Sequence, residues 1–227
     1  MREALVFASQ SQLDFHEIRE NVIRIPEVVM RVREAQKIWD NLDMPALDIA
    51  NFISSDDAVF LGNIRTKAFV TAVIQVGLLD RYLKNFNLPE VIVGLANGDA
   101  PLKVVVGEIT FFDLISENLA LSAPRKLQPI PSSGELPFLA GIQLSKYAAY
   151  KRQADGSFQL LASENPSLEN LLQTLVSQES IERIVVVGPG SSLRKSSLNI
   201  KVSDSIDLDP MLKWFWSSQE PKLVAVN

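Results

Sequence analysis

Residues 90–99 read Glu-Val-Ile-Val-Gly-Leu-Ala-Asn-Gly-Asp, a β-branched run that ends in a turn with two glycines. A short, continuous apolar run is typical of a strand that is buried on both faces, as in a parallel sheet. In the turn that follows, Gly94 and Gly98 are spaced so that the chain can bend sharply from a strand into a helix. This stretch therefore predicts a strand–turn–helix unit of an α/β protein.

Strands and helices alternate along the rest of the chain. Further strands are predicted at Ala4–Ala8, Leu139–Leu144, Tyr147–Lys151, Phe158–Leu161, Arg183–Val187 and Ile200–Val202, with a hairpin turn at Ala154–Ser157. Helices are predicted at Val28–Leu42, from Ala58, at Lys67–Lys84, Pro101–Val106, Phe111–Asn118 and Leu168–Ser177, from Ser191, and at Asp209–Trp216. This alternation predicts a three-layer α/β sandwich around a mostly parallel sheet.

Composition excludes several kinds of chemistry. The chain has 227 residues, 47% of them hydrophobic, which is enough for a sizeable core. It has no Cys and a single His, His16, so thiolate nucleophiles, disulfides and metal sites built on paired histidines are excluded. The net charge of −5 makes nucleic acid an unsuitable partner. We expect no metal and no cofactor.

The longest apolar stretch predicts a buried helix. Ala68–Leu79 is interrupted by Thr71 and Gln75, and it is shorter than the roughly twenty residues that a bilayer requires. The first twelve residues do not have the pattern of a secretion signal. The expectation is a soluble, cytoplasmic protein that does not interact with membranes.

Two strand ends are candidate binding positions, because open parallel sheets bind ligands beyond the carboxyl ends of their strands. One is the turn at Gly94–Gly98, which has the spacing of a nucleophile elbow but has Ala96 at its centre. Alanine has no atom that can attack a carbonyl group. The other is Gly188–Pro189–Gly190, where Gly188 and Gly190 precede a predicted helix, either as a phosphate-binding loop or as a packing turn.

Four segments resemble, in order, the malonyl-CoA:acyl carrier protein transacylases and the related acyltransferase domains of fatty-acid and polyketide synthases. Leu5–Gln12 resembles their opening strand and loop, and Gly94–Ile115 is similar to their Gly-His-Ser-Leu-Gly-Glu elbow with the helices after it. Asn165–Pro166 resembles the step before a late helix, and Val187–Leu193 the closing Val-Gly-Pro-Gly motif. The resemblance implies the fold of the large subdomain of these enzymes.

The departures from the family pattern concern its catalytic groups. The family's nucleophilic Ser falls on Ala96 and the His before it falls on Leu95, while Ser132–Pro137, the segment that resembles the one with the general base, contains no His. The family's substrate-binding Arg falls near Leu121. The resemblance therefore implies a vestigial cleft with no catalytic residues, formed by Gln10, Gly94, Leu95, Ala96, Asn97 and Gly98.

Part of an oxyanion hole is still implied by the resemblance. Gln10 stands at the family's oxyanion position, and the backbone N–H groups of Gln10 and Asn97 would hold a carbonyl oxygen. Gln10 as an amide that stabilises its loop is the alternative. The resemblance also implies a single acyltransferase-like domain over residues 1–227, with the family's ferredoxin-like small subdomain replaced by the loop 122–138, which contains the Pro-rich stretch Pro124–Pro137.

Three functions remain open. The first is an inactive homologue that binds an acyl carrier protein, a synthase component of fatty-acid or polyketide biosynthesis, another protein or a second copy of itself. The second is a divergent acyltransferase or thioester hydrolase that uses Ser9, Ser11 or Ser133 as its nucleophile. The third is a structural subunit with Trp214 and Trp216 at its interface, because Trp is enriched in such positions; core packing at the edge of the domain is the alternative for these two residues. A loose basic set, Arg125, Lys126, Lys146, Lys151 and Arg152, is either a carrier-protein contact or a solvated surface.

Overall fold

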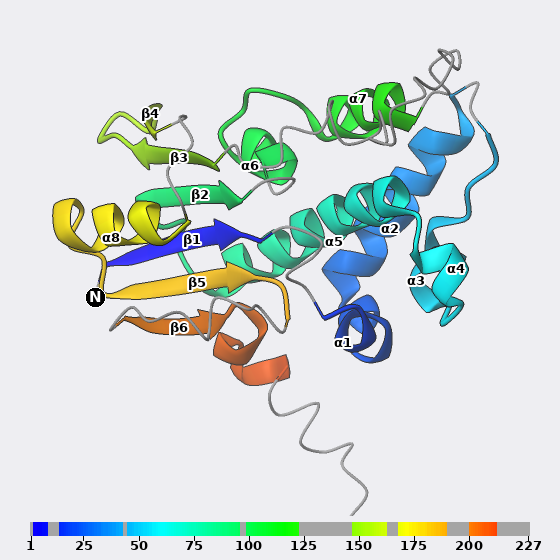
Figure 1. Cartoon of the computed structure of the whole chain (residues 1–227), viewed down its shortest axis with the longest axis horizontal. Helices are drawn as coiled ribbons and strands as arrows, with labels where there is room; N and C mark the ends of the chain where they lie inside the picture. Colours follow the sequence, from blue (N-terminus) through cyan, green and yellow to red (C-terminus); the bar gives the residue numbers. More distant parts are fainter. Residues whose placement is uncertain are drawn as a thin grey trace, which may run out of the picture.

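The described residues form a central six-stranded sheet (Figure 1). The structure is a computed structural model, and it describes residues 2–8, 14–42, 45–95, 99–122, 147–162, 168–189 and 200–212. The strand order is β4-β3-β2-β1-β5-β6. The strands are β1 (Glu3–Phe7), β2 (Val91–Leu95), β3 (Tyr147–Arg152), β4 (Phe158–Ala162), β5 (Arg183–Val187) and β6 (Lys201–Asp204). The pairs β2–β1, β1–β5 and β5–β6 are parallel. The pairs β2–β3 and β3–β4 are antiparallel. The predicted mostly parallel α/β sheet is confirmed.

Helices lie on both faces of this sheet and beyond the carboxyl ends of its strands (Figure 1). They are α1 (Phe15–Glu20), α2 (Pro26–Asp40), α3 (Ile49–Ser54), α4 (Ala58–Leu61), α5 (Ile64–Asn85), α6 (Asp99–Val105), α7 (Phe111–Ser122) and α8 (Leu168–Gln178), with short 3-10 turns at Val22–Arg24 and Ile206–Leu208. In Figure 1, α8 crosses the near face of the sheet and α5 passes behind it. The predicted three layers are therefore present.

Alternation along β1 shows which residues meet which layer. The hydroxyl of Tyr82, on α5, donates to Glu3 at 3.3 Å. Because successive strand residues point to opposite faces, Leu5 and Phe7 share the α5 face with Glu3, and Ala4 and Val6 point the other way. All four are fully buried. The apolar run at the start of the chain is thus explained by a strand with both faces covered.

Helices α2 and α5 pack closely against each other beside the sheet. Gly77 allows this approach, because a Cβ atom added to it would lie 2.6 Å from the Cα of Val28. Arg31 donates to Asp80 at 2.6 Å across the same contact. The apolar residues of α2 that face the core are Val28, Val32, Ala35 and Trp39.

Polar caps set several helix boundaries. The side chain of Asn63 accepts a hydrogen bond from Thr66 N and caps the start of α5. Thr110 and Asp113 bond each other's backbone N–H reciprocally at the start of α7. The hairpin turn is confirmed by the positive φ of Gly156.

The sequence patterns missed two short helices and placed three helix starts too late, because α2 begins at Pro26, α5 at Ile64 and α6 at Asp99. Helices α1 and α3 begin at the caps Asp14 and Asp48, but each has only six residues, too few for a clear apolar periodicity. Helix α6 begins at Asp99, two residues before the predicted Pro101. The predicted strand Leu139–Leu144, the helix from Ser191 and the end of the helix predicted at Asp209–Trp216 lie outside the described residues.

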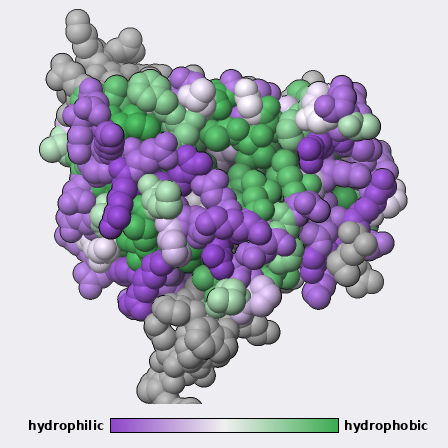
Figure 2. All heavy atoms as spheres, turned by 180° about the vertical axis from the view of Figure 1, so that it is seen from behind, coloured by the Kyte–Doolittle hydropathy of each residue, from purple (hydrophilic) through white to green (hydrophobic). Residues whose placement is uncertain are grey.

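The outer surface is polar with some apolar areas. Figure 2, the view from behind, shows an apolar band between polar borders. Apolar areas of this kind occur on monomers and at association surfaces alike. Among the described helices, none is both long enough and apolar enough to span a bilayer.

Candidate functional site

The carboxyl ends of β1, β2 and β5 lie side by side at one edge of the sheet. Phe7 of β1 is in register with Gly94 on one side and with Val187 on the other. Three adjacent parallel strands therefore end side by side, β1 at Phe7, β2 at Leu95 and β5 at Val187; the places where the chain leaves these strands are called their exits. Both strand ends that the sequence singled out flank β1, which is the arrangement expected of a ligand site in such a sheet.

The two flanking exits differ in their backbone. Gly94 is buried and still pairs with Ala148 of β3. Gly188 has a φ of 139°, a conformation that side-chain-bearing residues rarely adopt. Gly188 is therefore needed for the turn that leads the chain out of β5, and Pro189 after it is buried.

Gln75 of α5 joins two of these strand ends from behind. Its Nε2 donates to the carbonyl of Ala8 at 2.8 Å and to that of Val187 at 3.2 Å. The side chain has no exposed surface. Both partners are acceptors, so the amide has to present its N–H₂ group to them. Its Oε1 atom is buried and has no hydrogen-bond partner among the described residues.

A second contact links the same segments. The backbone N–H of Asp14 donates to the carbonyl of Pro189 at 3.1 Å. The Asp14 side chain accepts from the backbone N–H groups of His16 and Glu17 and so caps α1. Ala8 and Asp14, which flank residues 9–13, are thus both tied to the segment Val187–Pro189.

Most residues of the predicted site lie outside the described part of the chain. These are Gln10, Ala96, Asn97, Gly98, Gly190, Trp214 and Trp216, together with Ser9, Ser11, Ser133 and the Pro-rich stretch Pro124–Pro137. Leu95 is described only as the last residue of β2. Gly94 and Gly188 are both described and lie on either side of β1.

The remaining candidates give no second site. His16 is exposed on α1, and the described residues contain no cluster of three or more possible metal-ligating side chains. Of the loose basic set, Lys151 is paired with Glu179 at 2.6 Å, and Arg152 is exposed. The basic set is therefore partly neutralised within the chain.

Gln75 is the site residue that the sequence analysis did not identify. Its signal was present, because Thr71 and Gln75 interrupt an otherwise apolar run at a spacing of four. Residues four apart lie on one face of a helix. Two polar residues on the buried face of α5 indicate a polar contact inside the fold. The sequence did not show which groups are the partners in this contact.

The comparisons with known proteins agree with this architecture. No protein-family profile matches the chain, and no curated protein matches it. Solved structures do match, and they define a class of three-layer α/β proteins.

One of these structures is the acyl-carrier-protein S-malonyltransferase from Burkholderia pseudomallei, with 13% identity, a TM-score of 0.61, and coverage of 96% of this chain and 100% of that one. Another is the malonyl-CoA:acyl carrier protein transacylase from Clostridium perfringens, with 14% identity, a TM-score of 0.58 and full coverage of both chains. A third is a malonyl-transacylase in complex with a type II polyketide-synthase acyl-carrier protein, with 12% identity, a TM-score of 0.56, and coverage of 90% of this chain and 96% of that one. The chain has the fold of the malonyl-CoA:acyl carrier protein transacylases, as the sequence resemblance implied.

Proposed function

We propose that this chain is a transacylase-fold protein that binds an acyl carrier protein and does not transfer its acyl group. The observation that carries the proposal is Ala96, which follows β2 directly in the sequence, at the position where the enzymes that the chain resembles are expected to hold their serine. A methyl group cannot form the acyl-enzyme bond. Loss of a triad nucleophile lowers kcat by a factor on the order of 10⁶.

Three observations support binding at this place. The fold matches these enzymes along nearly the whole chain. The exits of β1, β2 and β5 lie together, and backbone donors at such strand ends are suited to hold a thioester carbonyl. A protein of the same fold is recorded in complex with an acyl-carrier protein. We further propose that residues 1–227 act as one domain, with the loop 122–138 in place of the small subdomain.

Acylation of the purified chain is the first test. The protein is incubated with malonyl-CoA and analysed by intact mass spectrometry, beside the variant Ala96→Ser. The wild type should carry no malonyl group. The variant should acylate at most slowly, because Leu95 replaces the His before the elbow and His16 is the only His in the chain. A stoichiometric malonyl adduct on the wild type contradicts the proposal.

Binding is the second test. A purified holo acyl carrier protein is titrated into the wild type and followed by calorimetry, with the apo carrier as the matched control. Tighter binding of the holo form is expected if the prosthetic arm reaches the strand ends. Absence of binding for both forms contradicts the proposal.

A fluorophosphonate probe distinguishes this proposal from the alternative of an enzyme with an unrecognised serine nucleophile. Stoichiometric labelling of Ser9, Ser11 or Ser133 would favour a divergent acyltransferase or hydrolase, and the absence of labelling is the expected result.

A further inference from the structure

Gln75 occupies an unusual position for an uncharged polar side chain. It lies on a long helix behind the sheet, is fully buried, and donates both of its N–H groups to carbonyls of two different strands. The ladder between β1 and β5 ends at Phe7 and Val187. Ala8 lies one residue beyond the ladder and Val187 is its last residue, so the amide holds the two strands together where the ladder stops.

The unpaired oxygen of Gln75 argues against a role in stability alone. A buried acceptor without a partner costs about 1–3 kcal/mol. A methionine of similar volume would fill the same space without this penalty. What an apolar side chain cannot provide is the pair of directional bonds to Ala8 and Val187.

The consequence reaches the segments around the candidate site. With Ala8 held by Gln75 and Asp14 held by Pro189, the two residues on either side of 9–13 have fixed positions relative to β5. The same bonds fix Val187, from which the chain turns through Gly188. The relative placement of two of the three strand exits thus depends on one side chain that the ligand itself would not contact.

We propose that Gln75 is a positioning residue: it sets the distance between the exits of β1 and β5, and through it the affinity of the site for an acyl carrier protein. This inference rests on the proposed function for its ligand, but its structural part is independent of any ligand.

The test uses the full chain and three variants. Gln75→Met keeps the volume and removes both bonds. Gln75→Glu keeps one hydrogen-bond donor while its carboxyl group is protonated. Once ionised it has no donor, and its carboxylate faces two carbonyl oxygens. Thr71→Val is the matched control, because Thr71 lies one turn earlier on the same face of α5, is 3% exposed, and has a hydroxyl oxygen without a partner among the described residues.

The first readout is amide hydrogen exchange at Asp14, whose N–H is bonded to Pro189. In Gln75→Met this amide should exchange at least tenfold faster than in the wild type, while amides in the centre of β1 and β5 keep their rates. Thr71→Val should match the wild type. In Gln75→Glu, the exchange rate of the Asp14 amide, corrected for the intrinsic effect of pH, should increase reversibly as the introduced carboxyl group ionises. This variant tests the role of the side chain in one folded sample, even if Gln75→Met fails to fold.

The second readout is the affinity for a purified holo acyl carrier protein, expected to fall about tenfold in Gln75→Met and to stay unchanged in Thr71→Val. The proposal is overturned if Asp14 exchanges at the wild-type rate in Gln75→Met, or if exchange increases equally throughout the sheet. It is also overturned if the wild type binds the carrier and Gln75→Met binds it equally well. If the wild type does not bind, the proposed function fails, and exchange at Asp14 alone decides the role of Gln75.

Discussion

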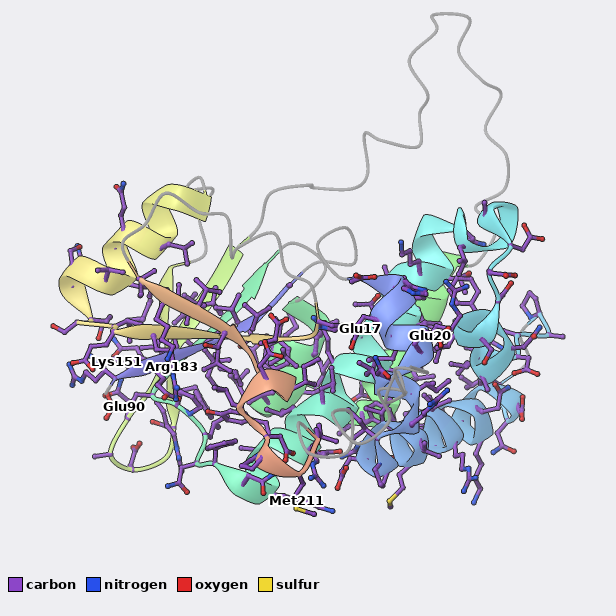
Figure 3. All side chains as sticks on the ribbon, turned by 90° about the horizontal axis from the view of Figure 1, so that it is seen from below. Glu17, Glu20, Glu90, Lys151, Arg183 and Met211 are labelled. Carbon is purple, nitrogen blue, oxygen red and sulfur yellow. The ribbon has the colours of Figure 1, made fainter. Side chains whose placement is uncertain are left out.

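Helix α5 makes different kinds of contact near the two ends of the strands. At the carboxyl ends of the strands it offers the neutral amide of Gln75 to two backbone carbonyls. Toward the amino ends, its last turns carry Arg81, Tyr82 and Lys84, which contact carboxylates. Glu90, Lys151 and Arg183 gather at that same end in Figure 3, while Glu17 and Glu20 lie on α1 at the other side of the molecule.

This difference indicates that contacts at the amino ends contribute to stability and those at the carboxyl ends to binding. The charged pair at the amino end, between Arg183 of β5 and Glu3 of the neighbouring strand β1, is partly buried, with side chains 17% and 18% exposed. The contacts described at the carboxyl end are directional but neutral, and they fix backbone segments around a place where a ligand would enter. Changes at the two ends should therefore affect different measurements.

Removing the charged partner of Glu3 at the amino ends of the strands should have the largest effect on the free energy of unfolding. Arg183→Met removes the cationic partner of the partly buried Glu3 carboxylate, which keeps the hydrogen bond from the Tyr82 hydroxyl. Removal of one member of a fully buried pair typically costs about 3–5 kcal/mol, and the partial exposure of this pair lowers the expected cost to about 3 kcal/mol. Urea unfolding should show this loss in the free energy of unfolding, while affinity for a holo acyl carrier protein changes less than twofold in the folded variant. Weaker carrier binding at unchanged stability would reverse the assignment of the two ends.

An intermediate effect is expected at Asp209, which docks the residues after β6 onto α5. Arg81 donates to it at 2.5 Å, and its other oxygen accepts from Met211 N and Leu212 N. Burial alone raises the pKa of Asp209, but these bonds outweigh it and hold the pKa below 3.8. Asp209→Asn should lower the free energy of unfolding by about 2 kcal/mol at pH 7, since a bond to a charged group is lost.

The pH dependence gives the sign of this contribution. Because the folded pKa of Asp209 is depressed, the contribution is present above its unfolded pKa near 3.8 and is lost as the pH falls through the lower folded value. The wild type and Asp209→Asn should therefore converge in acid. A difference in unfolding free energy that stays constant from pH 7 to pH 2 would contradict an electrostatic origin.

The smallest effect is expected at Tyr82. Burial, with the nearby Glu3 carboxylate, raises the pKa of Tyr82 from 10.0 to about 12. The neutral phenol stabilises the fold fully below pH 10, and this contribution is lost as the pH rises from 10 to about 12. Tyr82→Phe should cost about 1 kcal/mol at pH 7 and remove the alkaline loss.

Absorbance at 295 nm checks this prediction. In the folded protein one of the three tyrosines should titrate near pH 12, and this phase should be missing from Tyr82→Phe. Absence of a phase near pH 12 in the wild type would show that Tyr82 is not buried against Glu3.

Local patterns were sufficient for much of the fold. The apolar runs at Ala4–Ala8, Glu90–Gly94 and Arg183–Val187 predicted the three central strands within about one residue, because a strand covered on both faces needs apolar side chains throughout. The helices α1 and α3 escaped prediction because their caps, Asp14 and Asp48, have the same composition as ordinary turns.

The sequence by itself determined the α/β class, the alternation of strands and helices, and the alanine in the bend after the second strand, because these depend on residue type and on neighbours along the chain. Only the tertiary structure decided that the exits of β2 and β5 flank β1, and that Gln75 joins Ala8 to Val187 across 67 and 112 residues of sequence. An isolated polar residue in an apolar helix shows that it needs a partner. Which partner it finds depends on how distant strands pair, and no local pattern contains that information.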